Sequence, residues 1–366
     1  MSGKKNNARL VRVGPYKLGG ANPVRVQAMC DTDTRDVRAT VRQLRLLEDA
    51  GCEINRVAVP DLEAAEALRR IKKHVKSPLV ADIHFDWRLA VAAAVSGADK
   101  IRINPGNIGG REGVRAIVHS CRERGLPIRV GVNAGSLRLL KKIKGKVSLP
   151  PRRLAQAMAD EALEQVRLLE DEDFADIVVS LKADDAETTE LACRLFASKS
   201  SCPQHLGVTE AGSLMPGAVK SAVALSALLK DGIGATIRVS LSEKPELQVR
   251  CAYELLKALG LREYGPEIIS CPTCARACAD VRGIVHKLEA AIYSDSAQRK
   301  KAQGLKIAVM GCSVNGPGEA RGAHFGVAGA PAGGVFFENG QVVRRIKGAD
   351  WVKVLLKTIR QRGNRS

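Results

Sequence analysis

Eight short runs of apolar, mostly β-branched residues alternate with longer helical patterns between about residues 24 and 260. The predicted strands are Val24–Cys30, Ile54–Val59, Leu79–Phe85, Lys100–Asn104, Pro127–Asn133, Asp176–Lys182, His205–Glu210 and Ala235–Leu241. Eight such units over this length are typical of a (β/α)8 TIM barrel, which needs about 250 residues. A doubly wound sheet is the alternative, but it usually carries a glycine-rich phosphate turn after its first strand. The first run ends in Ala28-Met29-Cys30-Asp31 without such a turn, so the barrel is favoured.

The sequence changes in character after Gly260, where cysteine- and glycine-rich segments appear. Further strands are predicted at Lys306–Met310, Val335–Glu338 and Val342–Ile346, and an amphipathic helix at Asp350–Arg360. Asn339-Gly340 between two apolar runs indicates a β-hairpin. We therefore predict an α/β protein with a TIM-barrel domain over residues 1–262, followed by a smaller α/β domain over 263–366 that contains the cysteine-rich segments. Residues 138–146 are expected to form a basic, solvated loop.

The charge balance favours an anionic partner. The chain has 366 residues and carries 58 Lys or Arg against 39 Asp or Glu, a net charge of +19. Nucleic acid, a membrane surface and phosphorylated small molecules all fit such a charge. A hydrophobic content of 45% excludes global disorder, and no run approaches the ~20 apolar residues that cross a bilayer. The first residues lack the features of a secretory signal, so we expect a cytoplasmic protein.

Charged and polar residues lie in the predicted barrel strands, mostly toward their carboxyl ends, where barrel active sites form. These residues are Arg56, Asp82, His84, Arg102, Asn104, Arg129, Asn133, Lys182, Glu210, Arg238 and Ser240. Four Arg and one Lys face only two carboxylates, and an unpaired buried charge costs several kcal/mol. The surplus cations must therefore face water or an anionic ligand, and arginine matches phosphate oxygens with two parallel donors. We call this carboxyl end of the barrel, with the residues named above, the mouth, and we predict that it binds a ligand with more than one phosphate. Glu210 is predicted to be a proton donor or charge stabiliser.

Four of the ten cysteines form a pattern that indicates a metal centre. Cys271, Cys274 and Cys278 lie within eight residues, and Cys312 follows among glycines with Glu319 seven positions later. The spacing C-x2-C-x37-C-x6-E fits either an iron–sulfur cluster or a zinc site, with Cys278 or Glu319 as the fourth ligand. The remaining cysteines are expected to be small buried hydrophobic residues.

An ordered set of motifs makes the chain resemble the bacterial 4-hydroxy-3-methylbut-2-en-1-yl diphosphate synthases, from about residue 9 to 347. In order, the motifs are Gln27–Asp36, Ile54–Pro60, Ala81–Asp86, Ile101–Asn107, Gly131–Ser136, Gly207–Gly212, Cys271–Cys274 and Gly311–Glu319.

This resemblance implies two-electron reductive ring opening and dehydration of 2-C-methyl-D-erythritol 2,4-cyclodiphosphate, in the methylerythritol phosphate route to isoprenoids. It implies one 4Fe-4S cluster, flavodoxin or ferredoxin as electron donor, and a head-to-tail homodimer in which each second domain caps the partner's barrel. By motif, the cluster ligands would be Cys271, Cys274, Cys312 and Glu319. The diphosphate would meet Arg56, His84, Arg102, Arg129, Asn133, Lys182, Arg238 and Ser240, with Glu210 near the reacting carbons. Cys278 stands outside the family's ligand set.

The competing hypothesis is a basic nucleic-acid-binding protein with a structural zinc site. Charge and cysteines support it. However, aromatic residues make up only 3% of the chain, too few to interleave with the cations and stack bases, and the cations gather at strand ends.

Overall fold

The computed structural model describes residues 8–142, 149–312, 320–330, 333–347 and 351–362. The chain forms two compact units, Met1–Arg262 and Glu263–Ser366. Within the described residues, every helix is too short or too polar to span a lipid bilayer.

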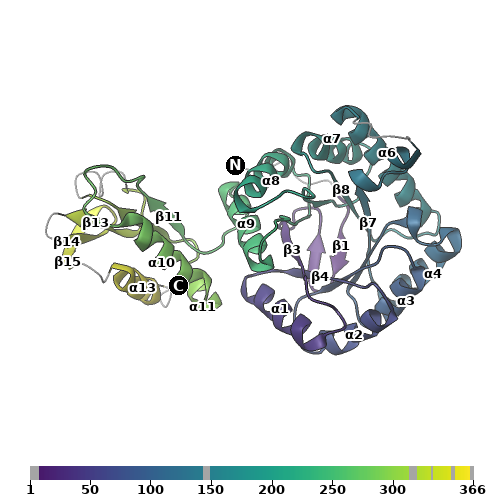
Figure 1. Cartoon of the computed structure of the whole chain (residues 1–366), viewed down its shortest axis with the longest axis horizontal. Helices are drawn as coiled ribbons and strands as arrows, with labels where there is room; N and C mark the ends of the chain where they lie inside the picture. The colour runs from purple at the N-terminus through teal and green to yellow at the C-terminus, as the bar shows by residue number, and fades with distance from the viewer. Residues whose placement is uncertain (1–7, 143–148, 313–319, 331–332, 348–350, 363–366) are drawn as a thin grey trace. The chain divides into compact units, whose positions relative to one another are not determined.

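The first unit is a TIM barrel, as the sequence predicts (Figure 1). Its parallel sheet has the order β8-β7-β6-β5-β4-β3-β10-β9, and a parallel bridge between Val179 and Gln204 joins the two ends. The strands are β3 (Arg25–Met29), β4 (Ile54–Ala58), β5 (Leu79–Asp82), β6 (Lys100–Ile103), β7 (Ile128–Asn133), β8 (Ile177–Lys182), β9 (His205–Leu206) and β10 (Thr236–Ile237). All eight are shorter than predicted, and the largest differences are at the carboxyl ends of β5, β9 and β10.

Helices surround the barrel in a ring, which Figure 1 shows nearly end-on. They are α1 (Val37–Asp49), α2 (Leu62–Lys72), α3 (Trp87–Val95), α4 (Gly110–Arg124), α5 (Arg138–Lys142), α6 (Pro151–Glu170), α7 (Ala186–Ala197), α8 (Leu214–Lys230) and α9 (Pro245–Ala258). Asp36 caps α1 by accepting a hydrogen bond from the Ala39 amide. Arg138–Lys142 is helical rather than the expected loop, and residues 143–146 lie outside the described residues.

Side chains alternate between the two faces of each barrel strand, and the two faces have different chemistry. The outward residues, such as Val57, Ile101 and Val130, are aliphatic and fully buried against the helices. The inward residues are largely polar: Arg129 donates to Gln27 on β3, and Lys182 lies beside His205 on β9. Helix packing therefore stabilises the barrel from outside, while its interior holds hydrogen-bonding groups.

An N-terminal hairpin, which the sequence analysis did not predict, packs against the barrel. Strands β1 (Val11–Val13) and β2 (Tyr16–Leu18) pair antiparallel around Gly14, whose positive φ of 54° suits glycine. Val11, Val13 and Leu18 form one core cluster with residues from the early part of several barrel strands: Ile54, Val80, Val178 and Ala235. The hairpin thus covers the amino-terminal end of the barrel and leaves the opposite end for ligands.

The second unit is a five-stranded sheet in the order β11-β12-β13-β14-β15, with helices sharing its main core. The strands are β11 (Glu267–Ser270), β12 (Lys306–Met310), β13 (Phe325–Ala330), β14 (Gly333–Glu338) and β15 (Gln341–Ile346); the helices are α10 (Val281–Tyr293), α11 (Ser296–Lys301) and α13 (Trp351–Arg362). The predicted hairpin forms, with Asn339 and Gly340 at φ 46° and 78° between β14 and β15. The sequence analysis missed β11, β13, α10 and α11.

Candidate active site

Asp82 organises the cations at the carboxyl ends of the barrel strands. Its carboxylate lies 3.1 Å from Arg102 Nη1, 3.3 Å from His84 Nε2 and 3.8 Å from Arg56 Nε. Burial opposes ionisation of this carboxylate, but Arg56, the His84 hydrogen bond and Arg102 outweigh that cost and lower the pKa of Asp82. Asp82 is thus a permanent anion that holds two arginines in place. The sequence analysis noted Asp82 but did not assign it a role.

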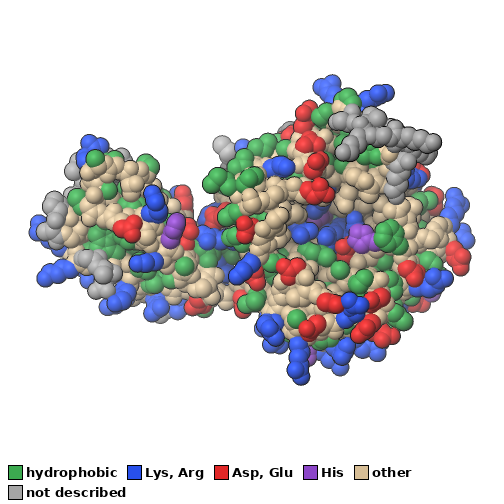
Figure 2. All heavy atoms as spheres, in the orientation of Figure 1, with side chains coloured by type: hydrophobic (Ala, Val, Ile, Leu, Met, Phe, Trp, Pro, Cys, Tyr) green, Lys and Arg blue, Asp and Glu red, His purple; other side chains and the backbone are tan. Residues whose placement is uncertain are grey.

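The cations of the mouth greatly outnumber this carboxylate. Asp82 is the only acidic residue on the described barrel strands, whereas the interior cations are Arg56, Lys100, Arg102, Arg129, Lys182 and, just after β10, Arg238. Several of their nitrogens are buried without a hydrogen-bond partner among the described residues: Lys100 Nζ and the Nε atoms of Arg102, Arg129 and Arg238. In Figure 2, blue Lys and Arg atoms and a purple His lie at the centre of the barrel face. The mouth thus contains many cationic hydrogen-bond donors, which an anionic ligand would pair with.

Burial places electrostatic strain on Arg129 and Lys182, which are 1% and 6% exposed. Burial lowers the pKa of Arg129 well below its usual value, and the neighbouring Arg56 and Arg102 lower it further. Burial, followed by repulsion from Arg238 and Arg129, has the same effect on the pKa of Lys182. A bound anion would relieve both the desolvation and the repulsion.

Lys100 is a buried lysine of the barrel interior that the sequence analysis did not single out. It opens β6, is fully buried, and burial followed by Arg129 lowers its pKa. The sequence contains a signal for this placement. Lys100, Arg102 and Asn104 alternate with isoleucines, so the three polar side chains must share one face of the strand.

Two glycines make room for the long side chains of the mouth. A Cβ at Gly131 would lie 2.7 Å from Arg102 Nε, and one at Gly207 would lie 2.7 Å from Lys182 Nζ. Both distances are too short for real contacts, so the glycines allow the Arg102 and Lys182 side chains to cross neighbouring strands.

The other predicted ligand-binding residues lie around the same mouth. Asn133 ends β7 directly opposite Lys182 in the β-ladder, and Ser240 follows Arg238 by two residues and is half-buried. His84 is 57% exposed and lies within 3.5 Å of Arg102 Nη1 through its ring nitrogens.

Glu210 occupies a strained turn between β9 and α8. Its side chain is exposed, and its φ of 51° is unusual for a residue other than Gly, Asn or Asp. Hydrogen bonds hold the turn on both sides, from Thr209 N to Ala183 O and from Ser242 N to Gly212 O. Among the described residues, Thr273 in the Cys271–Cys274 segment is the only other such case. Backbone strain of this kind clusters at functional sites.

The sheet of the second unit places two predicted metal ligands at one edge. Cys271 directly follows β11, Cys312 follows the parallel neighbour β12 by two residues, and the Gly311 amide donates to Cys271 Sγ at 3.1 Å. Cys271, Cys274, Cys278 and Cys312 are free thiols and none is fully buried. Amide donors to sulfur are typical of iron–sulfur sites, so this edge suits a thiolate-bound cluster.

The complete ligand set is not assembled within the described residues. No group of three or more His, Cys, Asp or Glu side chains there is close enough to hold a metal ion. Glu319, the proposed fourth ligand, lies outside the described residues. Cys278 is tied to the same edge, because its amide donates to Gly311 O at 2.7 Å.

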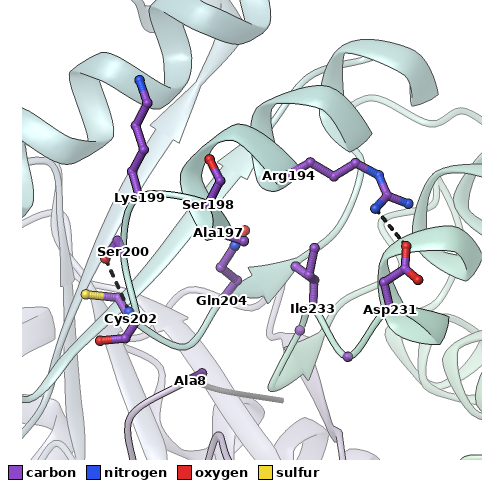
Figure 3. Close-up of a pocket in the computed structure, with 13 residues that line it drawn as sticks. Ala8, Arg194, Ala197, Ser198, Lys199, Ser200, Cys202, Gln204, Asp231 and Ile233 are labelled. Atoms are coloured by element: carbon purple, nitrogen blue, oxygen red, sulfur yellow. Dashed lines mark hydrogen bonds and ion pairs between the residues drawn. The ribbon is translucent and has the colours of Figure 1, made fainter. Parts of the chain in front are cut away.

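A separate cavity of about 630 Å³ lies away from the mouth, before β9 and β10 (Figure 3). Arg194 on its wall pairs with Asp231 at 2.7 Å. Cys202 accepts a hydrogen bond from Arg9 at 2.7 Å, and burial raises the pKa of its thiol. The cavity contains none of the predicted site residues.

Comparison with known proteins assigns the family. The model of the GcpE TIM-barrel domain matches residues 8–253, and that of the GcpE protein C-terminal domain matches residues 267–361. The chain belongs to the GcpE family. A relative from Thermodesulfovibrio yellowstonii, 4-hydroxy-3-methylbut-2-en-1-yl diphosphate synthase (flavodoxin), is 46% identical over 358 residues, covering 98% of this chain and 99% of its own. A relative of the same name from Geobacillus kaustophilus is 50% identical over 355 residues, covering 97% and 92%.

A solved structure gives independent support for the fold of this GcpE chain. An HPPK-DHPS variant from Plasmodium falciparum, with pterin and p-hydroxybenzoate, superposes with a TM-score of 0.50 at 9% identity, covering 78% of this chain and 52% of that chain. At this identity the likeness concerns the fold alone. The predicted family resemblance is confirmed, and the names of the relatives give no support to the nucleic-acid alternative.

Proposed function

We propose that this chain reduces 2-C-methyl-D-erythritol 2,4-cyclodiphosphate to 4-hydroxy-3-methylbut-2-enyl diphosphate and water, with flavodoxin as the electron donor. Family membership and the names of the relatives support this activity and this donor. The observation that carries the proposal within this molecule is the cationic barrel mouth, where Asp82 is the only acidic residue on the described strands.

The diphosphate would bind among Arg56, Arg102, Arg129, Lys182 and Arg238, with His84, Asn133 and Ser240 as further hydrogen-bonding partners. Because Asp82 already holds Arg56 and Arg102, these side chains are oriented before the ligand arrives. Preorganised donors of this kind need little rearrangement when charge develops on the leaving oxygen. Glu210 would deliver a proton to the hydroxyl that leaves as water.

One 4Fe-4S cluster would be held by Cys271, Cys274, Cys312 and Glu319 in the second unit. When bound, such a cluster would pass electrons from the reduced donor to the substrate one at a time, two for each turnover. The chain would contribute three thiolates, the Gly311 amide that donates to Cys271 Sγ, and the Glu319 carboxylate, a harder and weaker ligand than a thiolate. The family resemblance also supports a homodimer in which each second domain caps the partner's barrel.

Metal analysis of anaerobically purified protein tests the cofactor assignment. We expect about four iron and four sulfide per chain and a brown protein, as the cluster formula requires. A colourless protein that contains zinc and no iron would contradict the proposal and favour a structural zinc site.

Changing one of the mouth arginines to leucine tests the substrate assignment. Arg56, Arg102, Arg129 and Arg238 are each expected to lose about tenfold or more in affinity for the cyclodiphosphate, because a charge-assisted hydrogen bond contributes ~1.5–3 kcal/mol. Isothermal titration under anaerobic conditions, without reductant, measures this binding. Unchanged affinity in all four variants would refute the assignment.

Arg238→Leu is expected to weaken substrate binding but to stabilise the ligand-free protein. Burial, followed by Arg56, lowers the pKa of Arg238 to about 9, with Asp82 opposing the shift. Removing a charge that the ligand-free fold disfavours should raise the melting temperature by ~2–4 °C, the change that accompanies roughly 1 kcal/mol. Differential scanning calorimetry measures it; a lower melting temperature would show that the ligand-free mouth does not strain this arginine.

A further inference from the structure

Three buried side chains form a hydrogen-bonded row inside the barrel, and the first is a proposed substrate ligand. Lys182 Nζ lies 3.2 Å from His205 Nε2, and His205 Nδ1 lies 2.7 Å from Thr236 Oγ1. Lys182 is 6% exposed, while His205 and Thr236 are fully buried. His205 and Thr236 are directly opposite each other on β9 and β10. The row therefore runs from the mouth into the barrel across three strands.

The hydrogen-bonding capacity of each group fixes the tautomer of His205. When a phosphate is bound beside it, Lys182 is an ammonium, which has only donors, so His205 Nε2 must accept from it. A neutral imidazole then carries its proton on Nδ1, and this N–H donates to Thr236 Oγ1. Burial, followed by repulsion from Lys182, lowers the pKa of His205 well below its usual value, which agrees with a neutral ring.

A neutral imidazole suits a phosphate-binding lysine better than a carboxylate would. It fixes the ammonium with a hydrogen bond but leaves the positive charge uncompensated. A carboxylate at the same place would neutralise that charge and compete with the diphosphate. Gly207 leaves room for the ammonium at this position, since a Cβ there would lie 2.7 Å from Nζ.

We propose that His205 is a positioning residue, held in its Nδ1–H tautomer by Thr236, which directs the Lys182 ammonium toward a phosphate of the substrate. This inference rests on the proposed function, because it takes the cyclodiphosphate as the ligand of Lys182.

Removing the imidazole tests the role through binding. His205→Leu is expected to weaken cyclodiphosphate binding about tenfold, the effect of losing one hydrogen bond to a charged group, and to change kcat much less than KM. Thr236→Val is expected to weaken binding by a smaller factor, and Thr236→Ser to recover most of that loss. Ser221→Ala removes a buried hydroxyl from α8 and serves as the matched control, with unchanged affinity.

A double-mutant cycle separates positioning from a general structural effect. If His205 acts through Lys182, His205→Leu has no further effect on the Kd in a Lys182→Met background. Equal losses in both backgrounds would overturn the inference while leaving the proposed function intact. Failure of the wild-type protein to bind the cyclodiphosphate would overturn both.

The tautomer gives a second readout that does not depend on the folding of the leucine variant. The ¹⁵N spectrum of His205 in the wild-type protein saturated with the cyclodiphosphate should show a protonated Nδ1 and an unprotonated Nε2. A protonated Nε2 would overturn the inference, because it could not accept from Lys182.

Discussion

Replacing Cys312 by serine is expected to reduce turnover to the background rate and to remove most of the bound iron and sulfide. Cys312 lies at the same sheet edge as Cys271, and the Gly311 amide before it already donates to the Cys271 sulfur. A hydroxyl is a poor replacement for a thiolate in an iron–sulfur site. Iron and sulfide analysis, with the visible absorption spectrum, measures the loss.

Cys278→Ser is the matched control, because Cys278 lies at the same edge and its exposed thiol makes a long contact, 3.5 Å, to Arg276 O. We expect nearly unchanged iron content and activity.

Glu319→Ala should lose most activity and destabilise the cluster. An inert Glu319 and an essential Cys278 would show that the proposed ligand set is wrong.

Glu210→Gln is expected to slow turnover by ~100-fold or more, the usual scale of a lost general acid. The amide keeps the size of the side chain and the strained turn at φ 51°, so the fold, the cluster and substrate affinity should be preserved. Steady-state kinetics together with binding titration separates these effects. Glu187→Gln, an exposed carboxylate on α7, should behave as wild type. Near-normal turnover in the Glu210 variant would remove the residue from the mechanism.

The barrel and its mouth were predictable because the relevant signals are local and repeated. Each strand is a short aliphatic run between helical patterns, and charged residues such as Arg56 and Arg102 break those runs. The two-residue alternation within a strand then places such residues inside. Asp36 at the start of α1 and Asn339-Gly340 in the hairpin were predictable for the same reason, since caps and tight turns depend on adjacent residues.

Features that depend on contacts between distant segments were not predictable from these patterns. The β1–β2 hairpin is recognisable only when Val11 and Leu18 meet Ile54 and Val178 in one core cluster. Strand β13, Phe325–Ala330, contains glycines that weaken its strand pattern, yet it lies centrally in the second sheet. The role of His205 was hidden because its partners lie 23 and 31 residues away on neighbouring strands.

Conversion of the cyclodiphosphate by anaerobically purified wild-type protein tests the central claim most directly. With reduced flavodoxin as the sole electron source, mass spectrometry should detect 4-hydroxy-3-methylbut-2-enyl diphosphate, with two electrons consumed per product. Absence of this product from an iron-replete protein, under conditions where a relative such as the Geobacillus kaustophilus enzyme forms it, would contradict the account.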